Sequence, residues 1–186
     1  MKNNTKKHKE LGWSFVVLLL AFTLSLFFGV ASEFALDKAS IWLAAIIIVI
    51  FIIIAIISDM VGVAIASASP EPFHAMAARK VRGAKQAIKL VNNASKVASI
   101  ASDVIGDVCG ILSGAAAASI AIMIDAGSVF YNVLIGAGFS ALVASITIFG
   151  KSIFKKYAID NAEKIILVLG KVMSIFSREN GKNQKK

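Results

Sequence analysis

The chain has 186 residues, of which 58% are hydrophobic, and it still carries a formal net charge of +9. Its mean hydropathy is +0.79, so apolar and basic residues must be segregated along the chain, as is typical of an integral membrane protein with basic ends. A nucleic-acid-binding protein would need a soluble surface of clustered cations and aromatic residues. No such module is visible, and we expect no nucleic acid partner. The single cysteine, Cys109, excludes an internal disulfide bond.

Four stretches are apolar over the length of about 20 residues that a membrane-spanning helix needs. The first follows a basic leader, residues 1–10. Its apolar core is too long for a secretory signal, so we interpret it as a retained span. The second is the most apolar run, and it ends in small residues before Pro70 and Pro72, which disfavour helix in the residues that precede them. The predicted spans are residues 11–32, 41–66, 98–124 and 129–150.

Two further segments have the period of amphipathic helices. Residues 73–97 combine an imperfect apolar stripe with a basic face, which predicts a helix on the membrane surface that binds lipid headgroups. Its basic residues include Arg79, Lys80, Arg82, Lys85 and Lys89. Residues 155–178 begin with lysines and then place apolar side chains on one face. Together with a polar tail, 179–186, this predicts an all-α, polytopic helical membrane protein whose membrane domain covers residues 11–178.

The distribution of lysine and arginine predicts the orientation of these spans. The leader, residues 79–96 and the region after Lys151 are basic, whereas the links 32–40 and 124–128 hold one lysine between them. Four spans place all three basic regions on one side, which the positive-inside rule makes cytoplasmic. We therefore expect a multi-pass protein of the cell membrane with both termini in the cytoplasm.

Two carboxylates lie within the predicted third span. Asp103 and Asp107 are four residues apart, so they share one face of a helix, near its cytoplasmic end. Asp59 in the second span and Lys151 at the end of the fourth are predicted at a similar depth, from a rise of about 1.5 Å per residue. Ionisable residues inside a span are costly unless they are paired or hydrated, so they indicate an ion path by default.

Three interpretations of these charges stay open. The carboxylates, with Ser58 and Ser102 as further oxygen ligands, suit a hard cation such as Mg²⁺, which would be the transported or bound ion. Alternatively, Lys151 pairs with Asp103 or Asp107 and holds the bundle together without an ion, as in a scaffold or accessory protein. In the third interpretation, both aspartates lie at headgroup depth and contact water.

Gly106, Gly110 and Gly114 recur at every fourth residue on a neighbouring face of the third span. Small residues at this spacing let another helix approach closely. The pattern predicts that this face packs against another helix.

Four stretches between residues 58 and 169 carry a family resemblance. A span ends in GVAIASAS, a helical segment reads RGAKQAIKLVNNASKVAS, the next span opens with SDVIGD, and a later one ends at GKSIFKKYAIDNAEKI. In this order they resemble the transmembrane domain of the CNNM/CorB/CorC family, associated with magnesium and cobalt transport or efflux. SDVIGD stands where the family has G-N-x-x-x-N, and GKSIFKK stands where it has G-E-x-x-P-K. The resemblance implies divalent cation transport or homeostasis, and a homodimer.

The sequence departs from the family at the residues that concern the ion. The family's two asparagines correspond to Asp103 and Asp107, its intramembrane glutamate to Lys151 and its proline to Phe154. The net formal charge of the first three positions is unchanged, but its carriers are exchanged. Two outcomes follow: a cation site with rearranged charges, or a fold relative in which lysine replaces the ion. The family's CBS pair has no counterpart in the polar tail, and the first span is an addition.

No group of residues predicts catalysis or another cofactor. The histidines, His8 and His74, have no cysteine or histidine partner at metal-ligand spacing. GAGFSA, residues 136–141, fits G-x-G-x-x-A, but it lies within an apolar span, where helix packing explains the glycines. No nucleophile, base and orienting acid can be assembled, so we expect that the protein is not an enzyme.

Overall fold

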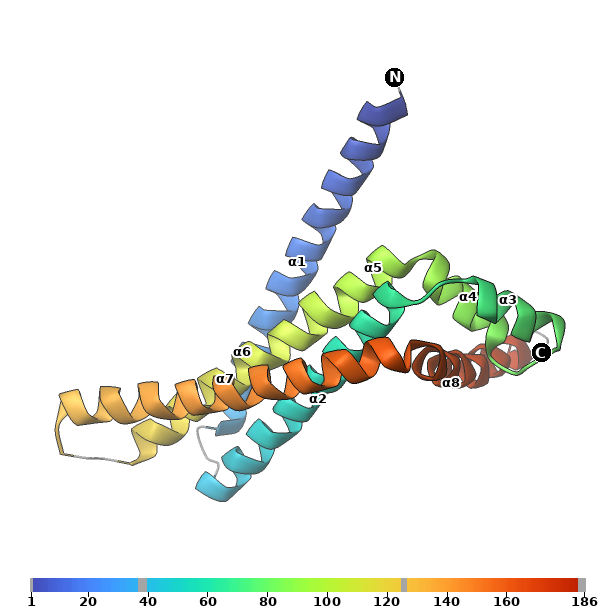
Figure 1. The fold of residues 1–186 in the computed structure, drawn as a ribbon. Helices are drawn as coiled ribbons and strands as arrows, with labels where there is room; N and C mark the ends of the chain where they lie inside the picture. The colour runs from blue at the N-terminus through green and yellow to red at the C-terminus, as the bar shows by residue number, and fades with distance from the viewer. Residues whose placement is uncertain (1, 37–39, 125–126, 184–186) are drawn as a thin grey trace.

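The structure is a computed structural model that describes residues 2–36, 40–124 and 127–183 (Figure 1). Every regular element in these residues is a helix, which confirms the predicted all-α fold. Within them, four helical runs are long and apolar enough to cross a membrane. These candidate spans are Gly12–Ser32, Ile41–Ser67, Ala94–Ile120 and Val129–Asp160.

The first two candidate spans lie in α1 (Lys2–Leu36) and α2 (Ile41–Ser67). Helix α2 begins where the Ser40 hydroxyl oxygen accepts a hydrogen bond from the Leu43 amide, an N-cap that satisfies one of the free amides of the first turn. The helix ends shortly before Pro70, as the prolines predict.

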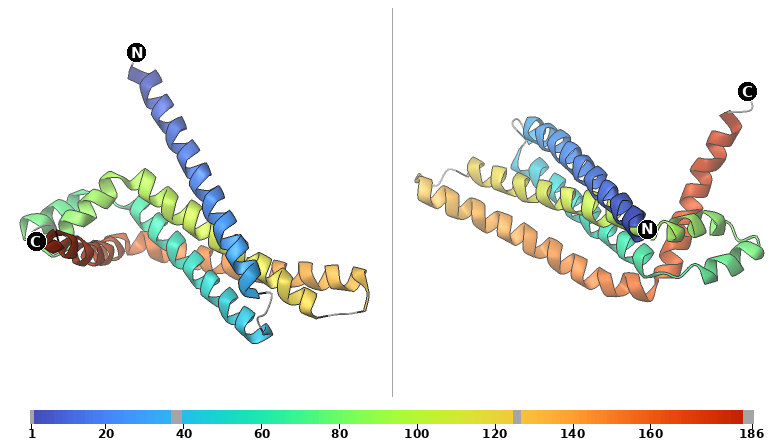
Figure 2. Two further views of the ribbon diagram at one scale, coloured as in Figure 1. Left: turned by 180° about the vertical axis from the view of Figure 1, so that it is seen from behind. Right: turned by 90° about the horizontal axis from the view of Figure 1, so that it is seen from above.

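Helix α7 (Val129–Asp160) continues beyond residue 150, where the fourth span is predicted to end. The chain then breaks at Asn161, whose amide closes the last turn of α7. The amphipathic segment predicted over 155–178 therefore begins later, as α8 (Ala162–Asn183). Figure 2 shows that α8 leaves the end of α7 at a steep angle.

The basic segment predicted as one helix over 73–97 is instead divided into α3 (Glu71–Ala78) and α4 (Ala84–Asn92), followed by the start of the third span. The turn between them places Lys80 at φ 57° and Gly83 at φ 89°. This left-handed conformation is one that glycine adopts without a steric penalty. The prediction of a single surface helix is wrong because a glycine turn divides it.

The third span consists of three consecutive pieces: α5 (Ala94–Ser99), the π-helical segment η1 (Ile100–Gly106) and α6 (Asp107–Met123). It starts a few residues before the predicted position, because Asn93 ends α4 and its side-chain amide donates back to that helix. The π-helical segment was not predicted.

Helix α2 lies at the centre of the bundle, against α6 and α7, while α1 lies along η1 and α6 (Figure 2). Small and branched side chains form the core between α2, α6 and α7: Ala44, Ile48, Ile52, Ala116, Ala117, Ile120 and Val143. Large apolar side chains such as Phe22, Trp42 and Phe130 point outward and are exposed. Apolar outer faces are what a lipid environment requires.

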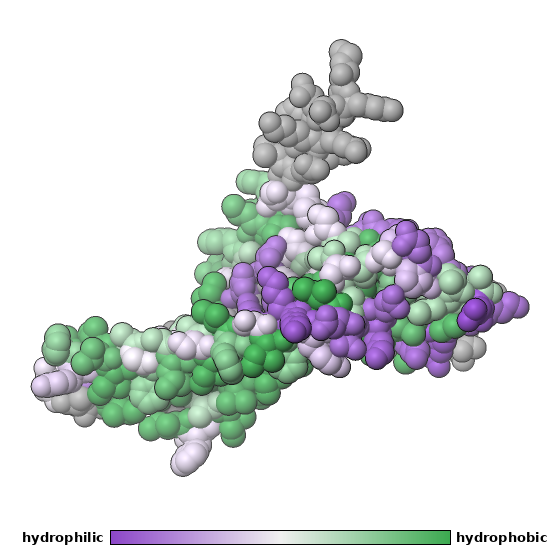
Figure 3. Space-filling model, in the orientation of Figure 1, coloured by the Kyte–Doolittle hydropathy of each residue, from purple (hydrophilic) through white to green (hydrophobic). Residues whose placement is uncertain are grey.

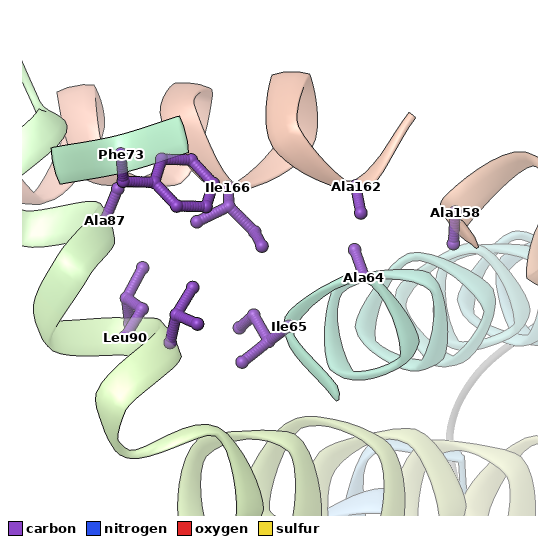
Figure 4. Close-up of a cluster of buried hydrophobic side chains, with 9 residues drawn as sticks. Ala64, Ile65, Phe73, Ala87, Leu90, Ala158, Ala162 and Ile166 are labelled. Atoms are coloured by element: carbon purple, nitrogen blue, oxygen red, sulfur yellow. The ribbon is translucent and has the colours of Figure 1, made fainter. Parts of the chain in front are cut away.

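A second core lies where α3 and α4 fold over the ends of α2 and α8 (Figure 4). It is formed by Ala64, Ile65, Phe73, Ala87, Leu90, Val91, Ala158, Ala162 and Ile166. We call the end of the molecule made by α3, α4 and α8 the basic end, because hydrophilic side chains gather there while the long helices are hydrophobic (Figure 3). The apolar stripe of the basic segment is thus buried within the protein instead of facing lipid.

Candidate functional site

The third span is π-helical over the seven residues of η1, which follow α5 and include Asp103. Single π-helical turns inside α-helices are rare and frequently lie at functional sites. Ala101, Val104 and Gly106 of this segment are buried toward the bundle, whereas Asp103 is exposed. The apolar periodicity of the sequence holds no signal for such a segment.

Asp107 forms an ion pair with Lys151 of α7. The Lys151 Nζ donates to Asp107 Oδ1 over 2.8 Å, and the two side chains are 21% and 62% exposed, respectively. The bond links α6 to α7 close to the basic end. Of the two ion pairs left open by the sequence, the structure contains the one with Asp107.

Asp103 has a different partner. Its Oδ2 accepts a hydrogen bond of 2.9 Å from the Ser99 hydroxyl, one turn earlier on the same helix. Among the described residues, no lysine or arginine nitrogen lies within ion-pair distance of its carboxylate. The spacing of Ser99 and Asp103 could have indicated this bond, because residues four apart lie side by side on a helix.

Asp59 and Ser102 bring α2 against η1. The Ser102 hydroxyl donates to the backbone oxygen of Asp59 over 3.5 Å. A Cβ atom on Gly62 would collide with the Ser102 hydroxyl oxygen, so α2 and η1 pack closely here. The Asp59 carboxylate and the half-buried Ser58 form no hydrogen bond with the other predicted ligands in the described part of the chain.

The three carboxylates do not converge into a ready-made metal site. In the described residues, no group of three or more histidine, cysteine, aspartate or glutamate side chains is arranged to hold a metal ion. A cation at Asp103 or Asp107 would therefore take one or two carboxylates, with hydroxyl or backbone oxygens and water as further ligands. Mg²⁺ is commonly bound in this way, because it gives up its water ligands reluctantly.

The three glycines of the third span differ in their surroundings. A Cβ atom on Gly106 would lie 3.4 Å from the Ala55 backbone oxygen, so this glycine lies against α2. A Cβ atom on Gly110 or Gly114 would meet nothing within 4 Å. At Gly114 the contact is a hydrogen bond instead, donated to its carbonyl by the Ser140 hydroxyl of α7 over 3.1 Å.

The residues predicted to face lipid headgroups are exposed at the basic end (Figure 3). They lie in the turn after α3 and on the outer side of α4: Arg79, Lys80, Arg82, Lys85 and Lys89. The opposite side of α4 is buried against α2 and α8. Contact with a membrane would therefore involve their charges and not an apolar face of α4.

Comparison with protein-family models, curated proteins and solved structures gave no match for this chain.

Proposed function

We propose that this multi-pass membrane protein binds and transports a divalent cation, Mg²⁺ or Co²⁺, at the acids near the basic end. The proposal also places both termini and the basic end in the cytoplasm. The observation that carries it is a difference between the two acids: Lys151 neutralises Asp107, whereas among the described residues the partner of Asp103 is the Ser99 hydroxyl. A carboxylate inside a candidate span without a counter-charge favours a cation as its partner.

In this proposal the Lys151 ammonium competes with the cation. A cation that arrives at Asp103 would be drawn to Asp107 one turn further along, and the lysine would have to release that carboxylate. The close contact between Gly62 of α2 and Ser102 holds η1, the segment that carries Asp103, against α2. The resemblance to the CNNM/CorB/CorC transmembrane domain supports Mg²⁺ or Co²⁺ as the ion.

A second candidate function is that of a non-transporting scaffold or accessory protein. The 2.8 Å bond between Lys151 and Asp107 favours it, because a built-in ammonium can take the place of an ion. In that case the charges only hold α6 against α7.

Thermal unfolding in detergent, titrated with MgCl₂ against NaCl of equal ionic strength, tests the proposal. A ligand that binds only the folded state raises the unfolding midpoint in a saturable way. We expect such a rise, and we expect Asp103→Asn and Asp107→Asn to abolish it. Glu163→Gln, which removes an exposed carboxylate of α8, is the matched control and should leave it intact.

Uptake of Mg²⁺ into proteoliposomes that contain an Mg²⁺-sensitive dye then tests transport itself. A midpoint that follows ionic strength alone, together with no uptake above that of empty liposomes, would overturn the proposal and leave the scaffold function.

A further inference from the structure

A hollow of about 420 Å³ lies at the basic end of the seam between α1 and the α4–α5 corner. Its polar lining comes from Trp13 of α1 and from Asn92, Asn93, Ser95 and Lys96 around that corner. Each of these side chains can donate a hydrogen bond, and none of the described residues that line the hollow is acidic. Such a lining suits an anion.

Trp13 and Lys96 hold the two sides of the hollow together. The Lys96 ammonium lies 4.9 Å from the centroid of the Trp13 indole, a cation–π contact. The Trp13 Nε1–H is buried, and it has no acceptor among the described residues. Because a buried donor without an acceptor is costly, a small shift of the side chains at this seam that lets a ligand oxygen reach the N–H would be favourable.

The surroundings indicate what kind of anion this is. Val16 and Leu20 lie one and two turns beyond Trp13 on the same face of α1, and both are apolar and exposed. The hollow therefore has a cationic rim on one side and a lipid-facing apolar surface on the other. Tryptophan and lysine at the end of a span are typical of the membrane interface.

We propose that this hollow binds the phosphate group of an anionic phospholipid, with Lys96 as the charged ligand and the acyl chains along Val16 and Leu20. This hollow is independent of the proposed cation function, because it uses none of Asp103, Asp107 and Lys151. It would attach α1 to the rest of the bundle through a lipid.

The fluorescence of Trp13 reports on this site directly. The chain has two tryptophans, so Trp42→Phe, which replaces an exposed side chain, leaves Trp13 as the single reporter. In this background, protein in phosphatidylcholine nanodiscs is compared with protein in nanodiscs of increasing phosphatidylglycerol content. We expect a saturable change in Trp13 emission, because the Lys96 ammonium that lies over the indole is drawn toward the phosphate.

Matched variants distinguish a site from general attraction to charge. Lys96→Gln should weaken the response roughly tenfold, as expected for one charge-assisted hydrogen bond, and Lys96→Arg should restore it. Lys85→Gln removes an equal charge from the exposed side of α4 and should have little effect. An equal loss in Lys96→Gln and Lys85→Gln would overturn the proposal. So would a response to inorganic phosphate or glycerol phosphate without one to phosphatidylglycerol, because the ligand would then be a soluble phosphate. If Lys96→Gln does not fold, Ser95→Ala, which removes one hydroxyl donor from the lining, is compared with the parent protein, and an unchanged response would overturn the proposal.

Discussion

The ion pair between Asp107 and Lys151 is asymmetric, because the lysine is 21% exposed and the aspartate 62%. Removing Asp107 leaves the more enclosed charge, that of Lys151, without a partner. Substitution of Asp107 should therefore lower the free energy of unfolding more than substitution of Lys151. Fully buried pairs lose about 3–5 kcal/mol when one partner is removed, and partial exposure lowers that figure. The pair is thus a modest contribution to stability that links α6 to α7.

A double-mutant cycle tests this pair. We expect Lys151→Met to lower the free energy of unfolding by about 1–2 kcal/mol and Asp107→Leu by somewhat more. The double substitution should restore most of the loss, because no unpaired charge remains. Denaturant unfolding in detergent, followed by circular dichroism, gives the four free energies. Strictly additive losses would mean that the pair contributes nothing.

The same lysine should also affect cation binding. If Lys151 competes with the cation for Asp107, Lys151→Met should lower the apparent Kd for Mg²⁺ by roughly tenfold, because one competing unit charge is removed. Calorimetric titration of the purified protein measures this, with Lys164→Met on α8 as the control for loss of an exposed lysine. Unchanged or weaker binding would exclude the competition and favour a lysine that supports the site only structurally.

At the scale of elements, the contact between α4 and α8 depends on two glycines. Gly83 lies at φ 89°, and a Cβ atom on it would be 2.5 Å from the Lys171 amide nitrogen. A Cβ atom on Gly170 would collide with the Gly83 carbonyl oxygen. The close approach lets the apolar stripe of α4 reach the core around Ile166.

Gly170→Ala should therefore lower stability by about 1–3 kcal/mol, as overpacking does where the neighbouring backbone cannot move away. Gly138→Ala on α7 is the matched control, since a Cβ atom there meets nothing within 4 Å. It should be neutral or slightly stabilising, because alanine favours helix over glycine. Unfolding midpoints of both variants in the same detergent provide the comparison. Equal midpoints for the two variants would show that α8 can separate from α4 without loss.

The sequence predicted the long helices well because each is specified by its own residues: an apolar run of sufficient length, the prolines after α2 and the polar links. It failed where a partner far along the chain decides the outcome. The apolar stripe around Leu90 has the pattern of a membrane-surface helix, and only contact with Ile166 of α8 shows that it is a protein core. Lys151 and Asp107 were predicted at a similar depth, but the sequence holds no local signal for the π-helical segment, whose Ser102 lies against Gly62 of α2.

At the scale of the whole molecule, the outer face of α6 is the surface on which we expect copies of this chain to meet. Asp107, Ile111 and Ala115 recur every fourth residue and are exposed, and Gly110 and Gly114 lie beside them with open space at their Cα atoms. Small residues along an exposed face of a span favour close approach of a second helix. We therefore expect the homodimer implied by the family resemblance to form along α6.

Cross-linking in membranes tests this arrangement. In a Cys109→Ser background, Ile111→Cys should form a disulfide-linked dimer on mild oxidation, because Ile111 is 64% exposed at the centre of the proposed contact. Phe149→Cys on α7, where the native side chain is 68% exposed, is the control for chance collision in the bilayer. Efficient cross-linking at position 149 but not at position 111 would place the contact on α7. Cross-linking at neither position, together with a monomeric mass by light scattering in detergent, would contradict the dimer. A dimer along α6 would bring two Asp107 side chains toward one interface, so that the ion pair with Lys151 would also reduce the repulsion between copies.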